Sequence, residues 1–221
     1  MTMAALLGWG TWVGIDLVSV GQVMIARPLV AGVVAGGILG DLQTGLMVGT
    51  ILELFALEVL PFGAARYPDY GVGTVGAVAT AAGVPGLLGP GIGVAVGLFI
   101  AFLGERAIQL VRHRTSVEVR RHLRSIDAGD RATIHRLHRR AILRDGFRAL
   151  VLTALGLALA AGVGFAPVMS IRGAVLLTAV AVGIGLGTAG VSGLRIARDR
   201  RTGLAWLAAG LAGGVAWVFI R

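Results

Sequence analysis

Long apolar segments alternate with short polar ones along this chain, and the lengths of these segments predict its elements. A helix that rises ~1.5 Å per residue needs about 20 apolar residues to cross ~30 Å of hydrocarbon. The segments that approach this length are residues 6–24, 44–60, 87–103, two within 149–194 around a turn at 166–172, and 203–220. The pattern therefore predicts helices that cross a membrane.

Two other apolar segments are rich in glycine and too short to cross a bilayer. Residues 29–40 read as a re-entrant half-helix, and residues 70–85 read as the start of a second broken hairpin. Broken helices at membrane depth leave backbone polar groups unpaired, which is tolerated where protein buries them or where they line a binding cavity. We therefore predict an all-α polytopic membrane protein with about six transmembrane helices and one or two re-entrant helical hairpins in its N-terminal half.

The composition supports a membrane protein and narrows its chemistry. Hydrophobic residues make up 56% of the chain and charged residues 14%, and the mean hydropathy is +0.86, which excludes an ordinary soluble domain. The 36 glycines predict helices that approach closely through small faces, and this packing favours an oligomer. Cysteine is absent, which excludes disulfides, thiolate metal sites and cysteine nucleophiles.

The net charge of +9 is concentrated in one segment, which predicts the topology. Residues 106–148 hold 12 of the 20 basic residues and all four histidines, so the positive-inside rule places this segment in the cytoplasm. The chain then divides into three regions. Residues 1–105 form an N-terminal membrane region, residues 106–148 an arginine-rich cytoplasmic segment, and residues 149–221 a C-terminal membrane region.

Apolar residues at helical spacing predict two short amphipathic helices in the cytoplasmic segment. They are Val119, Leu123 and Ile126 before a break at 127–130, and Ile134, Leu137 and Ala141 after it. Such helices can lie on anionic lipid or dock an acidic cytoplasmic protein. Nucleic acid is disfavoured because Phe147 is the only aromatic residue in the segment. His135 and His138 lie among arginines, which disfavours a bound cation.

Carboxylates within the apolar N-terminal region indicate a polar pathway. Asp41, Glu53 and Glu58 all lie between residues 27 and 69. A charged side chain at the centre of a bilayer costs about 2.5 to 3.5 kcal/mol on insertion scales, so it persists where it pairs, lines a wet cavity or serves a substrate. Together with the broken helices, these residues favour a transporter.

The same region resembles the N-terminal signature of the membrane subunit IIC of the mannose/sorbose family of bacterial phosphotransferase systems. The matching residues are Arg27-Pro28-Leu29, Gly40-Asp41, Thr44-Gly45, Gly49, Leu52-Glu53, Gly63-Ala64 and Pro68-Asp69. The resemblance implies a hexose permease of the bacterial inner membrane that works with a sister membrane subunit IID. It also implies cytoplasmic IIA and IIB subunits that carry phosphate on histidines, so the IIC chain itself is a transport subunit and not an enzyme.

Two departures from the family pattern leave a second interpretation open. The chain is shorter than a typical member, and its cytoplasmic segment is unusually rich in arginine. The alternative is a non-transporting membrane scaffold or sensor that is derived from this family and recruits cytoplasmic partners.

A hexose site needs carboxylates and amides that orient hydroxyl groups, and five residues fit this role. Glu53 and Asp69 are the main candidates. The alternative for Glu53 is a cap on the buried N-terminus of a half-helix, and for Asp69 an ordinary turn after Pro68. Asp41, with Gln43 and Thr44, either binds the sugar or ends one half-helix and caps the next.

Three further charged residues have simpler interpretations. Glu58 lies five residues after Glu53, on another helical face, which favours solvation. Arg27 is expected to reach toward the interface as an anchor. Asp16, alone in the first apolar segment, is expected to pair with Arg27 or Gln22, with contact to substrate as the alternative.

Motifs of other function classes are missing or lack their context. Gly71-Val72-Gly73-Thr74-Val75-Gly76 satisfies the GxGxxG pattern, but no strand precedes it and no soluble βαβ unit surrounds it. Its glycines are better explained by close helix contact. No Walker motif, zinc-ligand spacing or serine elbow is present, so the sequence predicts no catalytic residue, metal or cofactor.

Overall fold

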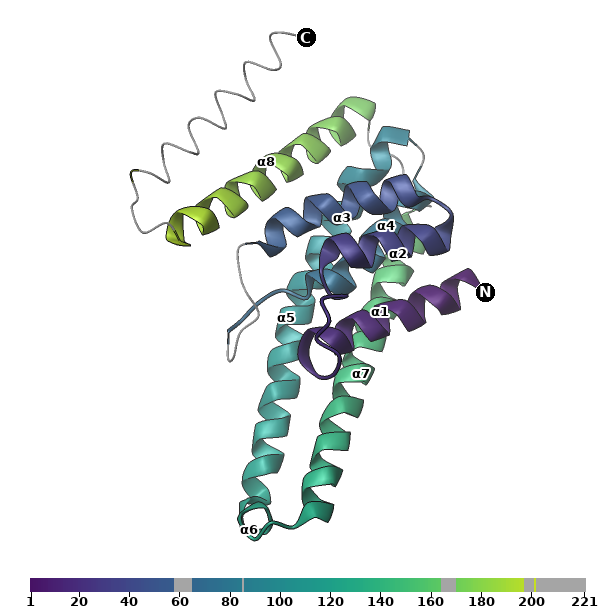
Figure 1. Cartoon of the computed structure of the whole chain (residues 1–221). Coiled ribbons are helices and arrows are strands. Elements are labelled where there is room, and N and C mark those ends of the chain that lie inside the picture. The colour runs from purple at the N-terminus through teal and green to yellow at the C-terminus, as the bar shows by residue number, and fades with distance from the viewer. Residues whose placement is uncertain (58–64, 85, 164–169, 197–200, 202–221) are drawn as a thin grey trace.

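The computed structural model describes residues 1–57, 65–84, 86–163, 170–196 and 201, and within these ranges every regular element is helical (Figure 1). The helices are α1 (Thr2–Val18), α2 (Pro28–Leu39), α3 (Leu42–Ala56), α4 (Tyr70–Gly83), α5 (Gly89–Arg121), α6 (Leu123–Asp127), α7 (Arg131–Val163) and α8 (Ile171–Ile196), with a 3₁₀ turn at Gly86–Leu88. The predicted all-α class is confirmed for this part of the chain. Glu58 and the predicted crossing at 203–220 lie outside the described residues.

Two long helices organise the molecule. Helices α5 and α7 each contain 33 residues and run side by side, and among the described helices they are the two that are long and apolar enough to cross a membrane. Their polar halves project away from the other helices and are joined by α6 (Figure 1). We call this projection, residues 106–144, the stalk.

The prediction of two short amphipathic helices in the arginine-rich segment is wrong. Residues 106–121 continue α5 without interruption, and residues 131–148 are the first half of α7. No proline or glycine occurs between Gly104 and Gly129, so nothing in the sequence ends α5 earlier. The boundaries expected at residues 105 and 148 therefore fall inside continuous helices.

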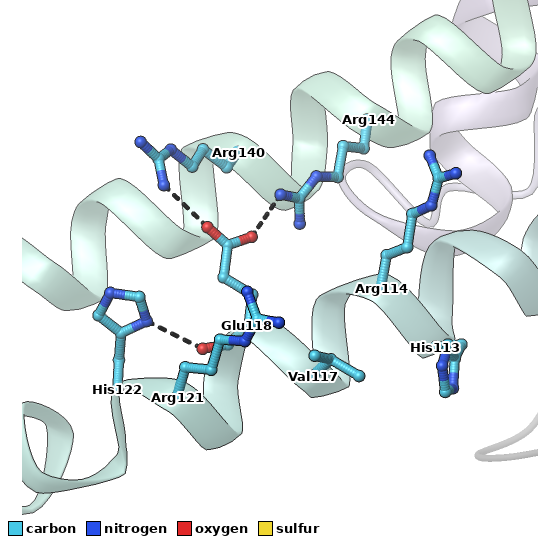
Figure 2. Close-up of a pocket in the computed structure, with 8 residues that line it drawn as sticks. All are labelled: His113, Arg114, Val117, Glu118, Arg121, His122, Arg140 and Arg144. Carbon is cyan, nitrogen blue, oxygen red and sulfur yellow. Dashed lines mark hydrogen bonds and ion pairs between the residues drawn. The ribbon is translucent and has the colours of Figure 1, made fainter.

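A carboxylate on α5 holds the two helices of the stalk together. Glu118 forms ion pairs with Arg140, at 2.8 Å, and with Arg144, both on α7 (Figure 2). The turn between the helices includes Gly129, whose φ of 72° favours glycine. The residues of the apolar pattern thus lie on a helical hairpin, where Val119, Leu123 and Ile134 remain exposed.

The first helix ends earlier than its apolar sequence suggests. Helix α1 stops at Val18 rather than at residue 24, and the chain then turns back through Gln22 and Met24, which have φ values of 50° and 69°. The buried carboxylate of Asp16 accepts hydrogen bonds from the backbone N–H groups of Val23 (2.8 Å) and Ala26 (3.1 Å). Asp16 therefore stabilises this turn through the backbone, and the expected pairing with Arg27 or Gln22 is wrong.

Helices α2 and α3 form a tight hairpin. Gly40, with a φ of 77°, makes the turn between them. A Cβ atom placed on Gly45 would lie 2.4 Å from the carbonyl oxygen of Gly32, so the two backbones touch where glycine removes the side chain. At ~1.5 Å per residue these helices are about 18 and 22 Å long, shorter than a ~30 Å hydrocarbon core. The bounds of α2 agree with the predicted half-helix at 29–40.

Helix α4 occupies the centre of the bundle. All nine residues from Tyr70 to Val78 are buried, and α4 packs against α1, α2, α3, α5 and α7. A Cβ atom on Gly73 would lie 2.4 Å from the carbonyl oxygen of Gly97 on α5, which explains the close approach of these two helices. The enclosed N-terminus of α4 begins at Asp69 and places that carboxylate inside the protein.

Candidate functional site

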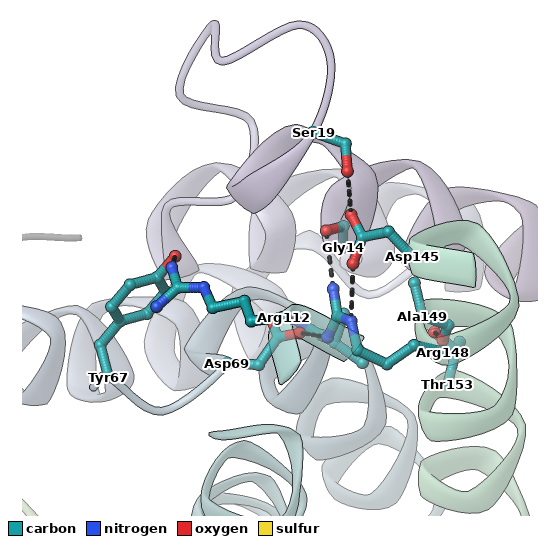
Figure 3. Close-up of polar contacts among 10 residues, drawn as sticks. Gly14, Ser19, Tyr67, Asp69, Arg112, Asp145, Arg148, Ala149 and Thr153 are labelled. Atoms are coloured by element: carbon teal, nitrogen blue, oxygen red, sulfur yellow. Dashed lines mark hydrogen bonds and ion pairs between the residues drawn. The ribbon is translucent and has the colours of Figure 1, made fainter. Parts of the chain in front are cut away.

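A buried arginine joins three helices in the interior of the bundle. Arg148 of α7 donates hydrogen bonds to Asp145 (Nε to Oδ1, 2.8 Å), to Asp69 (Nη1 to Oδ2, 2.5 Å) and to the carbonyl oxygen of Gly14 on α1 (Nη2, 2.9 Å). Figure 3 shows the guanidinium reaching between the two carboxylates. The side chains of Arg148 and Asp69 are 3% and 0% exposed, so the ion pair is out of contact with water.

Both oxygens of each carboxylate in this cluster accept hydrogen bonds from protein groups. The second oxygen of Asp69 accepts from the backbone N–H of Val72 at 3.2 Å and so caps α4. The second oxygen of Asp145 accepts from the hydroxyl of Ser19 at 2.6 Å. Both carboxylates and all three kinds of guanidinium nitrogen are therefore engaged with protein groups, which makes this cluster a structural junction.

The segment before Asp69 is held to α5 by a second arginine. Arg112 donates to the hydroxyl of Tyr67 at 3.0 Å and to the carbonyl oxygen of Ala65 at 2.9 Å, and its guanidinium lies 5.3 Å from the centroid of the Tyr67 ring (Figure 3). The backbone N–H of Asp69 donates to the carbonyl oxygen of Ala101, also on α5, at 2.9 Å. These contacts fix the start of α4 against α5.

Glu53, near the end of α3, contacts the start of α2. It forms an ion pair with Arg27, the residue that precedes α2, and accepts a hydrogen bond from the backbone N–H of Leu29 at 3.1 Å. The carboxylate thus caps the N-terminus of α2, as one of the two interpretations of the sequence expects. The side chains of Glu53 and Arg27 remain 19% and 29% exposed, unlike those of Asp69 and Arg148.

The N-termini of α2 and α4 lie side by side. The carbonyl oxygen of Ala26, just before α2, would lie 2.5 Å from a Cβ atom on Gly71 in the first turn of α4. The structure therefore brings the starts of two short helices together, with Glu53 at one and Asp69 at the other. The positive ends of half-helices that meet inside a membrane protein are a common setting for ligand sites.

The structure separates the other predicted residues from this pair. Asp41 caps α3 by accepting from the backbone N–H of Thr44 at 3.0 Å, as expected of a helix boundary. Gln43 is exposed beside it. Glu53 lies twelve residues further along α3, which corresponds to about 18 Å. Asp41, Gln43 and Thr44 therefore lie at the opposite end of the hairpin.

Sequence reasoning missed the role of Asp145 and Arg148. Both were counted with the cytoplasmic arginine segment, whereas both are buried. The available signal was their three-residue spacing directly before the apolar stretch that starts at Ala149, since paired charges at the edge of an apolar helix indicate a buried ion pair. Within the described residues, no group of three histidine, aspartate or glutamate side chains is arranged to hold a metal ion.

Comparison with protein families gives a match over most of the chain. The family model described as the sorbose-specific IIC component of the PTS system matches residues 1–189. Three similar proteins are the fructose permease IIC component of Bacillus subtilis (33% identical over 127 residues), the sorbose-specific EIIC component of Klebsiella pneumoniae (36% over 132) and the mannose-specific EIIC component of Escherichia coli K12 (28% over 125).

These alignments cover 57–58% of this chain and 46% of each relative, so the chain spans about half the length of the curated relatives it matches. Solved structures share the fold over nearly the whole chain. A structure of the mannose transporter ManYZ with microcin E492 contains a chain with a TM-score of 0.63 and 19% identity, covering 100% of this chain and 95% of that one. A second membrane protein has a TM-score of 0.62 and 20% identity, with 99% and 94% covered.

Proposed function

Because this chain belongs to the family of sorbose-specific IIC components of the bacterial phosphotransferase system, we propose that it is the sugar-translocating membrane subunit of a mannose-type system. In this role it binds a hexose and presents it to cytoplasmic subunits that phosphorylate the sugar, and it carries no phosphoryl group itself. The observation that carries the proposal is the family match over residues 1–189. The names of the relatives, which include permease components for fructose, sorbose and mannose, support a hexose as the substrate.

The proposed topology follows from helix lengths and charge. Helices α5 and α7 cross the inner membrane, and the chain as a whole makes about six crossings. Helix α2 is a re-entrant half-helix and α4 is a second re-entrant element, because at ~1.5 Å per residue they are about 18 and 21 Å long. Helix α3 begins the crossing predicted for residues 44–60. Residues 1–105 and 145–221 are the membrane regions, and the stalk, residues 106–144, is cytoplasmic.

We place the sugar contact at Glu53. Both carboxylates are bonded to protein groups, but the side chain of Glu53 is 19% exposed whereas that of Asp69 is fully buried. Carboxylates bind sugar hydroxyls through charge-assisted hydrogen bonds. In this account Arg27 orients the carboxylate of Glu53, and Asp69 positions the adjacent helix. Asp41 and Thr44 shape the far end of the hairpin, where the exposed amide of Gln43 is available to a passing sugar.

The proposed partners are a sister membrane subunit IID, cytoplasmic IIB and IIA subunits and membrane lipid, in an oligomer. A solved structure with a similar fold is that of the mannose transporter ManYZ in complex with microcin E492, which supports a membrane complex. The many close glycine contacts, such as Gly76 of α4 against Gly156 of α7, show that this fold already packs helices through small faces.

Phosphoenolpyruvate-dependent hexose uptake in cells that carry the full set of subunits tests the proposal. Glu53→Gln keeps an acceptor for the N–H of Leu29 but removes the charge, so uptake is expected to fall by roughly tenfold or more while the protein level is maintained. Glu105→Gln is the matched control, because Glu105 lies on α5 at the edge of the stalk and away from the hairpin. Unchanged uptake in the Glu53 variant would exclude the site.

One observation favours a second candidate function. The stalk carries many arginines and projects away from the helices of the membrane region (Figure 1). A scaffold or sensor that recruits cytoplasmic partners would use this surface without transporting sugar. Absence of uptake in cells with all subunits, together with retention of a cytoplasmic partner on membranes that contain the chain, would support this alternative.

A further inference from the structure

Basic side chains from both helices of the stalk converge on one groove. Its volume is ≈ 520 Å³, and it is lined by His113, Arg114, Val117, Glu118, Arg121 and His122 of α5 and by Arg140 and Arg144 of α7. Figure 2 shows Arg114 extending from α5 toward α7, beside Arg144. The groove therefore gathers cationic groups from segments that are far apart in the sequence.

The lining carries more positive charge than its own carboxylate can balance. Four arginines and one glutamate give a formal charge of +3, before any contribution from the two histidines. Glu118 pairs with Arg140 and Arg144. Arg114 and Arg121 lie one helical turn before and after Glu118, and neither forms an ion pair with another described residue. Two guanidinium groups thus remain available on the groove wall.

Glu118 shows what kind of group this arrangement binds. Its two oxygens each accept from a different arginine, so the guanidinium groups converge on an oxyanion. The hydrogen bond from Arg140, supported by Arg144, lowers the pKa of Glu118 below its ordinary value. Planar guanidinium groups match phosphate as well as carboxylate. A phosphate group would therefore use Arg114 and Arg121 and compete with Glu118 for the arginines of α7.

The position of the groove favours an anion dissolved in the cytoplasm over a lipid headgroup. The last buried residue of α5 is Ile108, and Glu118 lies ten residues beyond it. At ~1.5 Å per residue this is about 15 Å along the helix. The headgroup region extends only about 5 to 7 Å past the hydrocarbon on each side. Lipid phosphates thus do not reach the groove when the stalk points away from the membrane.

We propose that the stalk groove binds a small phosphate-bearing anion from the cytoplasm, of the sugar-phosphate class. The phosphate part of this inference rests on the groove alone. The sugar part rests on the proposed function, because a sugar-phosphorylating system releases a hexose phosphate on the side where the stalk lies. Occupancy of the groove would then report the level of that product to the membrane subunit.

Calorimetric titration of the full chain in phosphatidylcholine nanodiscs tests the proposal, with hexose 6-phosphate, inorganic phosphate and the neutral hexose as probes at fixed salt. Both phosphates are expected to bind in the groove, and the hexose is not. Arg114→Gln with Arg121→Gln is expected to weaken phosphate binding by roughly tenfold or more, because two charge-assisted contacts are lost. Arg124→Gln with Arg131→Gln removes the same charge outside the groove and is expected to leave the affinity within about twofold.

Glu118→Gln is the more discriminating variant, because it distinguishes a glutamate that competes with phosphate for the arginines from one that only fastens the two helices. The neutral amide releases Arg140 and Arg144, so affinity for hexose 6-phosphate is expected to rise by roughly tenfold. A glutamate that only fastens the two helices together would give no gain, and its loss would loosen the groove and weaken binding.

Several results would overturn the inference. If both double variants weakened phosphate binding equally, the general positive charge of the stalk, and not a defined site, would attract the anion. If phosphatidylglycerol in the nanodiscs inhibited phosphate binding, the groove would be a lipid site. Binding of inorganic phosphate without hexose 6-phosphate would exclude the sugar-phosphate class. By contrast, normal phosphate binding in a chain that supports no uptake would support the groove and refute only the proposed transport function.

Discussion

Arginine–carboxylate pairs occur in two regions of this protein, and their surroundings give them opposite roles. In the interior, Arg148 is enclosed with Asp69 and Asp145, and every group has a protein partner. In the stalk, Glu118 pairs with two exposed arginines while Arg114 and Arg121 stay unpaired within the described structure. The comparison teaches that burial and charge balance, more than residue type, separate a structural junction from a surface that can bind a ligand.

The ion pair between Glu53 and Arg27 is intermediate in burial between the interior cluster and the stalk. It is attached to the N-terminus of α2, yet both side chains are partly exposed. A carboxylate held by protein on one side and accessible on the other is suited to bind a ligand without losing its position. For this reason we assign the sugar contact to Glu53 and a positioning role to Asp69.

Breaking the interior junction is expected to have the largest effect. Arg148→Met leaves the carboxylates of Asp69 and Asp145 buried without their cation, which is expected to destabilise the protein by about 3 to 5 kcal/mol. Arg144→Met in the stalk removes a partly exposed partner and is expected to cost less than about 1 kcal/mol. Thermal unfolding in detergent compares the two variants, and equal losses of stability would contradict the distinction between the regions.

Adding a side chain where the backbones of α2 and α3 touch is expected to have the next largest effect. Gly45→Ala places a methyl group 2.4 Å from the carbonyl oxygen of Gly32, so the α2–α3 hairpin must open, at a cost of about 1 to 3 kcal/mol. Gly37→Ala, on the same hairpin, meets nothing within 4 Å and is expected to be neutral or slightly stabilising. Thermal unfolding compares the two alanine variants, and equal melting temperatures would contradict the tight α2–α3 hairpin.

Removing a helix cap is expected to have a smaller effect. Asp41→Ala takes away the acceptor for the N–H of Thr44 at the start of α3, which typically costs about 1 kcal/mol. Asp41→Asn keeps an acceptor oxygen and is expected to retain most of the stability. A midpoint of unfolding for Asp41→Ala that matches the wild type would show that this turn is held by the glycine contacts alone.

The smallest expected effect is the pH dependence of the stalk. Because pairing with Arg140 and Arg144 lowers the pKa of Glu118, this ion pair stabilises the folded stalk above the unfolded-state pKa of about 4.3 and loses that contribution as the pH falls through the lower folded value. The difference in melting temperature between wild type and Glu118→Gln is expected to be constant near neutral pH and to vanish in acid. A difference in melting temperature that grows as the pH falls would contradict a stabilising ion pair at Glu118.

The sequence predicted the parts of the fold that depend on local patterns. The bounds of the short helix α2 follow from the length of its apolar segment and from Pro28 at its start, and the cap at Asp41 follows from its place before a new apolar run. Neither prediction requires a contact between distant segments. The resemblance to the IIC family also came from one continuous region.

The features that depend on distant contacts could not be predicted in the same way. Asp16 ends α1 by holding a backbone turn, which no apolar pattern reveals. Arg148 meets Asp69 across 79 positions in the sequence, so its burial was hidden among surface arginines. The continuous stalk was missed because the spacing of apolar residues is the same in a short amphipathic helix and in one face of a long hairpin.

Equilibrium binding of a radiolabelled hexose to membranes without phosphoenolpyruvate tests the central claim most directly, because it separates recognition from phosphorylation. The membranes would contain the chain with its sister subunit. We predict saturable binding that weakens by roughly tenfold or more in Glu53→Gln and is unchanged in Glu105→Gln. Wild-type binding in Glu53→Gln, or no binding in any sample, would contradict a sugar site at the start of α2.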